Sequence, residues 1–130
     1  MFDWKKPTSQ MLGRWQPWHD GHTALFEKAL KKTGQVCIMF RDVSGVDAGV
    51  DGQEDNPFKF EEVKKRIIDG LSSHGYEHEK EYIVLKVPNV TDISYGRGVG
   101  YTFTEHDLGE EIHKISATKI RKKMRDLDEL

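Results

Sequence analysis

Apolar and polar positions alternate with two different periods along the first two thirds of the chain. Helical spacing of three or four positions alternates with short, continuous apolar runs, an order that is typical of an α/β domain with a mostly parallel sheet. In chain order, the sequence predicts a strand within residues 8–15 that ends at Gly13, a helix at 22–32, a strand at 36–40, a helix at 60–71 and a strand at 82–87.

The segments between and after these elements have weaker patterns. Residues 41–59 contain three glycines, a proline and several aspartates without periodicity, which predicts a long mobile loop of the kind that often acts as a lid. Residues 89–105 mix glycines with aromatics and predict a loop with a short strand near 99–104. A last helix is expected from Ser116 to about Arg125.

These elements predict one domain over residues 1–130, built as an open parallel sheet with helices on both faces. The central run at 36–40 is continuously apolar and is therefore expected to be buried on both faces, with Cys37 as a small core residue. Sheets of this class bind ligands at the carboxyl ends of their strands, near the point where the strand order reverses. The segment after Gly13 falls at such a place.

Composition narrows the class of protein further. The 20 basic and 22 acidic residues give a net charge of −2, which argues against a general nucleic-acid binder. No apolar run approaches the roughly 18 residues of a membrane span, and the first residues lack the apolar core of a signal peptide. A cytoplasmic protein without membrane or nucleic-acid partners is therefore expected, and any anion site must be local.

A local anion site is indicated directly after the first strand, where residues 13–22 read Gly-Arg-Trp-Gln-Pro-Trp-His-Asp-Gly-His. His19 and His22 are three positions apart, so near a helix start both rings can reach the same side. Two imidazoles beside the N–H groups of a first helical turn can donate hydrogen bonds to phosphate oxygens. Gly13 allows a close backbone approach and Gly21 a tight entry into the helix. The arrangement suits charge that grows on a phosphate during transfer.

Two other interpretations of this segment stay open. Trp15 and Trp18 could be core aromatics, with the two histidines acting as polar caps. Alternatively, His-x-x-His spacing could ligate zinc, although a closed site needs further ligands. The remaining histidines, which show no paired ligand motif, are His74, His78, His106 and His113.

A second candidate for anion binding lies about a hundred residues later, where residues 115–121 read Ile-Ser-Ala-Thr-Lys-Ile-Arg. Helices usually carry acidic residues in the first turn, but here Lys119 and Arg121 follow the probable cap at Ser116, and the first carboxylate is Asp126. An external anion would balance this cationic helix start. The other interpretation is a solvated basic helix face.

Both segments resemble the signatures of the nucleotidyltransferase superfamily that contains nicotinamide-nucleotide and pantetheine-phosphate adenylyltransferases and glycerol-3-phosphate cytidylyltransferases. Residues 13–22 look most like the archaeal-type nicotinamide mononucleotide adenylyltransferases, and residues 115–121 are similar to the Ile-Ser-x-Thr-x-Ile-Arg signature. The resemblance implies a Rossmann-like fold. It also implies direct attack by an acceptor phosphate on the α-phosphate of a nucleoside triphosphate, with pyrophosphate as the leaving group.

The resemblance also implies roles for individual residues. The implied catalytic residues are His19, His22 and Arg121, and the implied nucleotide-binding residues are Gly13, Arg14, Trp15, Gln16, Gly21, Ser116 and Thr118. Mg²⁺ is implied as a cofactor bound through the triphosphate, because a divalent ion bridges triphosphate oxygens and needs few protein ligands of its own. No residue is assigned to the metal.

Four residues are weaker candidates for binding the acceptor. Arg41 follows the second apolar run and could face a phosphate, or it could pair with Asp42 or with acids of the loop. Asn56, in Asn-Pro-Phe, resembles a segment that precedes an arginine-bearing helix in the adenylyltransferases, and Arg66 is the nearest match to that arginine. Arg97 lies among glycines, but this stretch is not a dinucleotide fingerprint, since it does not join a strand to a helix.

The resemblance favours transfer of AMP from ATP to a small phosphate-bearing acceptor such as nicotinamide mononucleotide. The short chain favours the alternative of a cytidylyltransferase that uses CTP and an acceptor such as glycerol 3-phosphate. A hypothesis from a different class is a non-catalytic nucleotide-binding module. Relatives in this superfamily often assemble, so a homo-oligomer is compatible with each interpretation.

Overall fold

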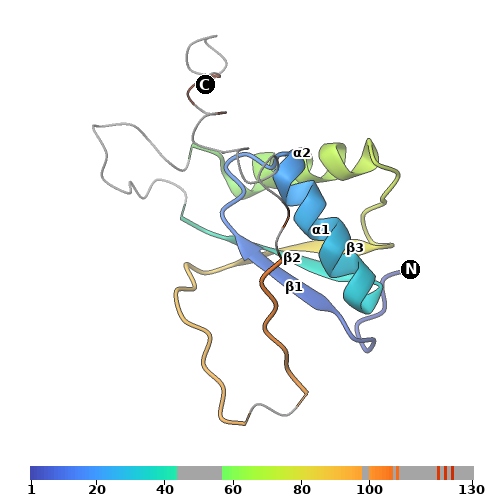
Figure 1. The fold of residues 1–130 in the computed structure, drawn as a ribbon. Coiled ribbons are helices and arrows are strands. Elements are labelled where there is room, and N and C mark those ends of the chain that lie inside the picture. The colour runs from blue at the N-terminus through green and yellow to red at the C-terminus, as the bar shows by residue number, and fades with distance from the viewer. Residues whose placement is uncertain are drawn as a thin grey trace.

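The computed structural model describes residues 1–43, 57–97, 100–106, 108, 120, 122 and 124. Strands and helices alternate in the described part of the chain (Figure 1). In order, they are β1 (Ser9–Gly13), α1 (Asp20–Thr33), β2 (Val36–Arg41), α2 (Phe60–Ser72) and β3 (Tyr82–Val87). The five elements predicted from periodicity are confirmed, although α1 begins two residues earlier than expected, at Asp20.

The three strands form one parallel sheet in the order β1-β2-β3. Gly13 lies opposite Phe40 in the β1–β2 register, and Arg41 lies opposite Val87 in the β2–β3 register. The carboxyl ends of all three strands therefore meet at one edge of the sheet. Because Gly13 and Phe40 are paired, Arg14 and Arg41 leave that edge at the same level.

The prediction of helices on both faces is wrong for the described residues, since α1 and α2 cover the same face. Both helices contribute to one core cluster with alternate residues of the strands. Right-handed strand-helix-strand connections place successive helices on one side when the strand order runs in one direction, as it does here. The order β1-β2-β3 also contains no reversal among the described strands. The buried members of this core on helices and strands are Phe26, Ala29, Val63, Ile67, Leu71, Met11, Val36, Ile38, Phe40, Tyr82 and Val84.

The opposite face of the sheet has a smaller apolar cluster. Phe2, Cys37 and Ile83 are buried there, with Met39 and Leu85 packed against them. The Phe2 N–H donates to the Glu79 carbonyl at 2.7 Å, which holds the N-terminal segment against the start of β3. Cys37 is a buried core residue, as predicted, and burial raises the pKa of its thiol.

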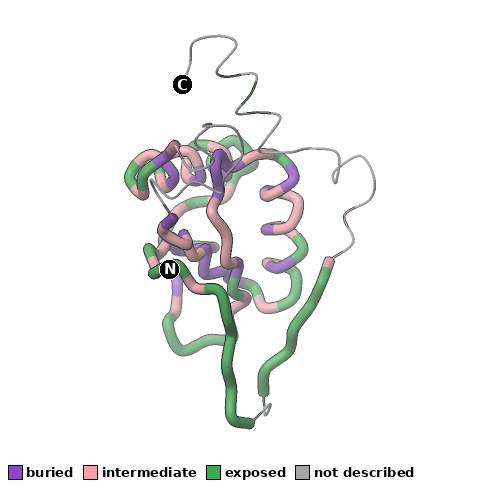
Figure 2. The backbone as a smooth tube through the Cα atoms, turned by 90° about the vertical axis from the view of Figure 1, so that its left-hand side faces the viewer, coloured by how far each residue is buried: buried purple, intermediate pink, exposed green. Residues whose placement is uncertain are grey.

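The short strand expected near 99–104 is absent from the described residues 100–104. Residues 88–97 leave β3 and form a long excursion away from the sheet, and 100–106 return from it (Figures 1 and 2). Tyr95 and Phe103 lie with ring centroids 5.6 Å apart, yet both are exposed. The side chains of residues 101–105 are exposed at consecutive positions, so neither face of this segment is buried as a strand face would be.

Parts of the predicted last helix are described. Ile120, Lys122 and Met124 are helical; Met124 is buried in the core, Ile120 packs against it and Lys122 is exposed. The prediction of a lid falls mainly on residues 44–56, which lie outside the described residues. The candidate site residues outside them are Asn56, Ser116, Thr118 and Arg121. None of the helices among the described residues has the length and apolar character of a membrane-spanning segment.

Candidate phosphate-binding site

His19 and His22 cap the start of α1 reciprocally. The Gly21 N–H donates to Nδ1 of His19 at 3.0 Å, and the His19 N–H donates to Nδ1 of His22 at 3.1 Å. This pair of hydrogen bonds forms a capping box, in which two imidazoles replace the usual hydroxyl and carboxylate. The two rings stack with centroids 3.6 Å apart and an interplanar angle of 17°.

These two hydrogen bonds determine which ring nitrogens carry protons. A nitrogen that accepts a backbone N–H cannot itself be protonated, so each neutral ring carries its hydrogen on Nε2. No described residue accepts a hydrogen bond from either Nε2, and neither atom is a buried polar atom without a partner. The site therefore presents two adjacent Nε2–H donors to the surroundings, held in place by the helix start.

The environment keeps both rings neutral. Burial and, to a lesser extent, the neighbouring His19 together lower the pKa of His22 to about 3. Burial also lowers the pKa of His19, partly opposed by the charge of Asp20. The neutral form is the one that makes both capping hydrogen bonds, so the donor pair is stable at physiological pH.

Trp15 and Trp18 enclose the ring of His22. The centroid of His22 lies 4.8 Å from that of Trp15 at 80° and 5.3 Å from that of Trp18 at 50°. Both indoles are buried, and their N–H groups are satisfied by the Met39 carbonyl at 3.0 Å and by Thr23 Oγ1 at 2.9 Å, respectively. The tryptophans are thus core aromatics, as one interpretation held, and they are also the source of the burial of His22.

Gly13 makes room for this aromatic wall. Trp15 has a positive φ of 52°, which turns its side chain back over β1. A Cβ on Gly13 would lie 2.7 Å from the Trp15 ring, closer than such contacts occur. Glycine at this position therefore serves the packing of Trp15 against the end of the strand.

Gln16 is a buried support of the same turn. Only 2% of the residue is exposed. Its amide nitrogen donates to the Phe58 carbonyl at 2.9 Å, and its amide oxygen accepts the Phe58 N–H at 2.9 Å. The pair of hydrogen bonds joins the turn after β1 to the segment before α2.

Gln16→Leu is expected to lower the free energy of unfolding by about 2–4 kcal/mol, because it leaves two buried backbone groups of Phe58 without partners. Urea unfolding followed by tryptophan fluorescence measures this loss. Gln10→Leu, at an exposed position of β1, is the matched control and should change stability by no more than about 0.5 kcal/mol. Equal losses in the two variants would contradict the bridging role.

Two arginines stand at the carboxyl edge of the sheet. Arg14 directly follows β1 and is half-buried. Arg41 is the last residue of β2, and its Nη1 reaches the Val90 carbonyl at 3.5 Å. Asp42, which the sequence offered as a possible partner of Arg41, has its Oδ2 3.4 Å from Lys86 Nζ.

The other two arginine candidates are placed differently. Arg66 Nε donates to Glu62 Oε1 at 2.8 Å within α2, and its guanidinium lies 4.6 Å from the centroid of the Phe58 ring. Arg66 thus reaches the segment that Gln16 holds, but its charge is already paired. Arg97 is exposed on the excursion after β3, and no described contact joins it to the histidine pair.

The geometry does not favour zinc at the histidine pair. Metal binding needs an unprotonated nitrogen that points outward, whereas the outward Nε2 atoms here carry the hydrogens. Among the residues that the structure describes, no three His, Cys, Asp or Glu side chains could hold an ion together.

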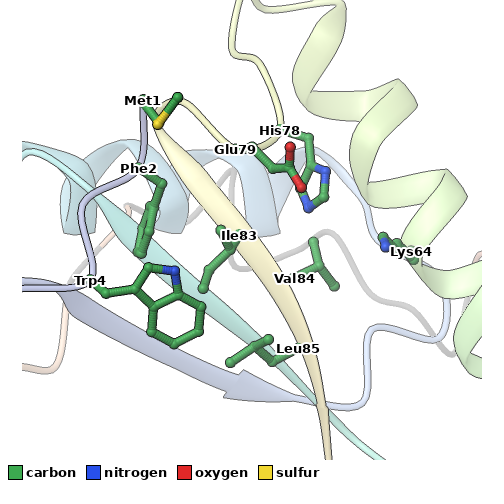
Figure 3. A pocket seen from close by; sticks show the side chains of 9 residues that line it. All are labelled: Met1, Phe2, Trp4, Lys64, His78, Glu79, Ile83, Val84 and Leu85. Atoms are coloured by element: carbon green, nitrogen blue, oxygen red, sulfur yellow. The ribbon is translucent and has the colours of Figure 1, made fainter.

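A pocket of about 450 Å³ lies elsewhere, along β3 (Figure 3). Phe2, Trp4 and Leu85 line one part of it, and His78 and Lys64 lie across the strand. None of the residues of the histidine turn lines this pocket. We therefore assign the candidate site to the start of α1, because the hydrogen-bond donors lie there, and not to this pocket.

Sequence reasoning missed two features of the site. It placed both histidines on one side of a helix start, but it did not foresee that each would accept a backbone N–H through Nδ1. The spacing of His19 and His22 could have indicated this, because it equals the spacing between the N-cap and the third helical residue in a capping box. It also assigned Trp15 and Gln16 to the nucleotide, whereas their described contacts support the turn; direct nucleotide contacts by these residues stay predictions.

The fold and site together define an α/β protein with a small open parallel sheet and a histidine-capped helix at the carboxyl edge of that sheet. Comparison with protein-family models, curated proteins and solved structures gave no match.

Proposed function

We propose that this protein is a nucleotidyltransferase that transfers a nucleoside monophosphate, AMP in preference, from a nucleoside triphosphate to a small phosphate-bearing acceptor. The observation that carries the proposal is the pair of Nε2–H donors, fixed side by side because both Nδ1 atoms accept backbone N–H groups. The resemblance of residues 13–22 and 115–121 to the nucleotidyltransferase signatures supports the same reaction class.

In the proposed reaction, an oxygen of the acceptor phosphate attacks the α-phosphorus, and the bond to the bridging oxygen of pyrophosphate breaks. The two Nε2–H groups donate to non-bridging and bridging oxygens on which negative charge grows. Fixed donors need no reorganisation during the reaction, which is the main advantage of such a site over water. The acceptor phosphate is already ionised, so no general base is required.

The surroundings of the pair suit an anionic substrate. The positive end of the α1 dipole lies beside the histidines, and Arg14 follows β1 at the same edge. Trp15 and Trp18 exclude water from one side of His22, which strengthens hydrogen bonds made by its other side. By the resemblance, Ser116, Thr118 and Arg121 would hold the β- and γ-phosphates.

Mg²⁺ would enter with the triphosphate. Such an ion is held mainly by phosphate oxygens and water and needs few protein ligands. When bound, it offsets charge on the triphosphate oxygens. The chain's own contribution is to orient the α-phosphate and to stabilise the charge that develops there.

Pyrophosphate release tests the proposal. The protein would be incubated with Mg²⁺, with each of the four common ribonucleoside triphosphates, and with a panel of phosphate acceptors that includes nicotinamide mononucleotide and glycerol 3-phosphate. Acceptor-dependent release with ATP is the expected result. Release with CTP and glycerol 3-phosphate would establish the cytidylyl alternative instead. Tight nucleotide binding without turnover for any pair would overturn the proposal and support a non-catalytic module.

A further inference from the structure

We propose that this protein forms a two-fold symmetric dimer in which an arm of each chain covers the open sheet face of the other chain. The arm comprises residues 88–97 and 100–106. The open face is the side of the sheet that carries Phe2, Cys37 and Ile83. This inference concerns assembly and does not depend on the proposed function.

The open face has no helical cover among the described residues. Both described helices, α1 and α2, pack in the larger core on the other face. On the open face, Phe2 packs with Cys37 and Ile83, whereas Met39 and Leu85 are only half-buried. Parallel sheets are normally covered on both faces, so this face is a candidate for an interface.

The arm exposes apolar side chains although it is held near both ends. Arg41 Nη1 lies 3.5 Å from the Val90 carbonyl, and Lys32 Nζ donates to Thr104 Oγ1 at 2.8 Å. Between these two contacts the arm extends away from its own sheet (Figures 1 and 2). The large apolar side chains that are at least 55% exposed there are Ile93, Tyr95, Tyr101 and Phe103.

The remaining exposed large apolar side chains of the described chain are Met1 and Trp4. Both line the hollow along β3, and Trp4 lies beside the open face with Phe2 and Leu85 (Figure 3). Unpaired apolar surface is thus concentrated on the arm and beside the open face. Because the arm points away from its own sheet, the arm of a second copy is the one that can cover this face. Two-fold symmetry then makes the same contact twice.

The area of these surfaces is sufficient for a stable dimer. At about 100 Å² for each exposed apolar side chain, the two arms and the faces beneath them would together bury roughly 1,600 Å². This is the size of a typical specific interface between proteins.

Charge favours the same pairing. Lys5 and Lys6 directly follow Trp4 and are exposed, and neither forms an ion pair with a described residue. The arm carries the exposed carboxylates of Asp92 and Glu105 against a single arginine. An arm laid beside Trp4 of a second copy therefore brings acidic groups to a basic segment, and at the rim of an interface such complementarity mainly guides association.

Sedimentation velocity of the full chain tests the dimer. We expect the wild type to sediment as a dimer at micromolar concentrations. The double variant Tyr95→Ser/Phe103→Ser should raise the dissociation constant at least about tenfold, since aromatic anchors dominate interface energies. Thr102→Ser, at an exposed position between the apolar residues of the same leg, is the matched control and should leave it unchanged. A wild type that stays monomeric would overturn the inference.

Mixing two variants distinguishes arm-to-face contacts from other dimers. Trp4→Ser should also weaken the dimer at least about tenfold, because it alters the face. A mixture of Trp4→Ser with Tyr95→Ser/Phe103→Ser restores one intact arm-to-face contact in each mixed dimer, so the mixture should dimerise more tightly than either variant alone. If mixing restored nothing, the arms would pair with each other or act elsewhere, and the inference would be wrong.

Trp4 also reports directly on the interface, because Trp15 and Trp18 are buried. Dilution of the wild type below its dissociation constant should increase quenching of tryptophan fluorescence by acrylamide. A dimer whose quenching does not change on dilution would place the interface elsewhere.

Thermal stability separates assembly from folding. Tyr95 and Phe103 are exposed, so their double variant should have the Tm of the wild type when both are measured as monomers. A fall of more than about 5 °C under these conditions would show that the two side chains support the fold of the single chain, which would count against the inference.

Discussion

His22→Asn is expected to lower turnover at least about a hundredfold, the usual scale for loss of one fixed donor to a developing oxyanion. Asparagine places its amide oxygen near the position of Nδ1, so it can still accept the His19 N–H that His22 accepts now. It has no donor at the position of Nε2. Turnover is measured with the triphosphate and acceptor that the panel identifies, and circular dichroism checks that helix content is unchanged.

His22→Gln is the matched opposite change. Glutamine reaches far enough to place an N–H near the position of Nε2, but it lacks an acceptor at Nδ1. We expect a smaller loss of turnover than in His22→Asn, together with a loss of about 1 kcal/mol of stability for the missing cap. If both variants lost activity and stability in parallel, His22 would act only as a cap and the donor role would be wrong.

The helices and strands could be predicted from the sequence where buried residues recur with a regular period. The helix α2 buries Val63, Ile67 and Leu71 completely at four-residue intervals, and β2 buries nearly every side chain from Val36 to Phe40. Such patterns reflect local geometry, so one chain suffices to recognise them. The face of the sheet on which each helix packs could not be predicted. It depends on the order of the strands in the sheet, and the periodicity of a strand does not encode that order.

The sequence predicted which residues belong to the candidate site, but it did not predict the contacts between them. His19 and His22 could be assigned to a helix start from spacing alone. The hydrogen bonds of Gln16 to Phe58 join residues 42 positions apart, and those of Trp15 to Met39 join residues 24 apart. Contacts over such separations depend on how loops cross the sheet edge, which local pattern cannot supply. The strand expected near 99–104 is absent from residues 100–104 for a similar reason, because a strand needs a partner strand, which local pattern does not specify.

Each of the two imidazoles at this helix start can act both as a cap and as a hydrogen-bond donor. The interpretation of the histidines as caps and their interpretation as phosphate ligands are therefore compatible. One edge of each ring completes the first turn of α1, as a cap would. That same bond fixes the tautomer, and hence makes the opposite edge a donor. Capping is therefore the means by which the proposed site sets the proton on Nε2, and loss of the cap should disturb both stability and chemistry.

The protein should lose stability as the pH falls from about 6.5 towards 3. The pKa of His22 is about 3 in the folded state, against an ordinary value of 6.5 in the unfolded chain. Between these values the unfolded chain binds a proton that the folded protein does not, so the free energy of unfolding rises with pH. Above pH 6.5, His22 is neutral in both the folded and the unfolded state, so its titration does not lower the free energy of unfolding. The free energy of unfolding declines by about 1.4 kcal/mol for each pH unit once the pH lies well below that value.

Urea unfolding at pH 7, 6 and 5 measures this effect, with His22→Asn as the variant that cannot titrate at this position. The stability difference between wild type and His22→Asn should move by about 2 kcal/mol against the wild type between pH 7 and pH 5. Titration of His19 acts in the same direction, because burial lowers its pKa too, but it is present in both proteins and cancels to first order. A difference that stays constant across this range would mean that His22 is not held neutral, and the fixed Nε2–H donor would lose its physical basis.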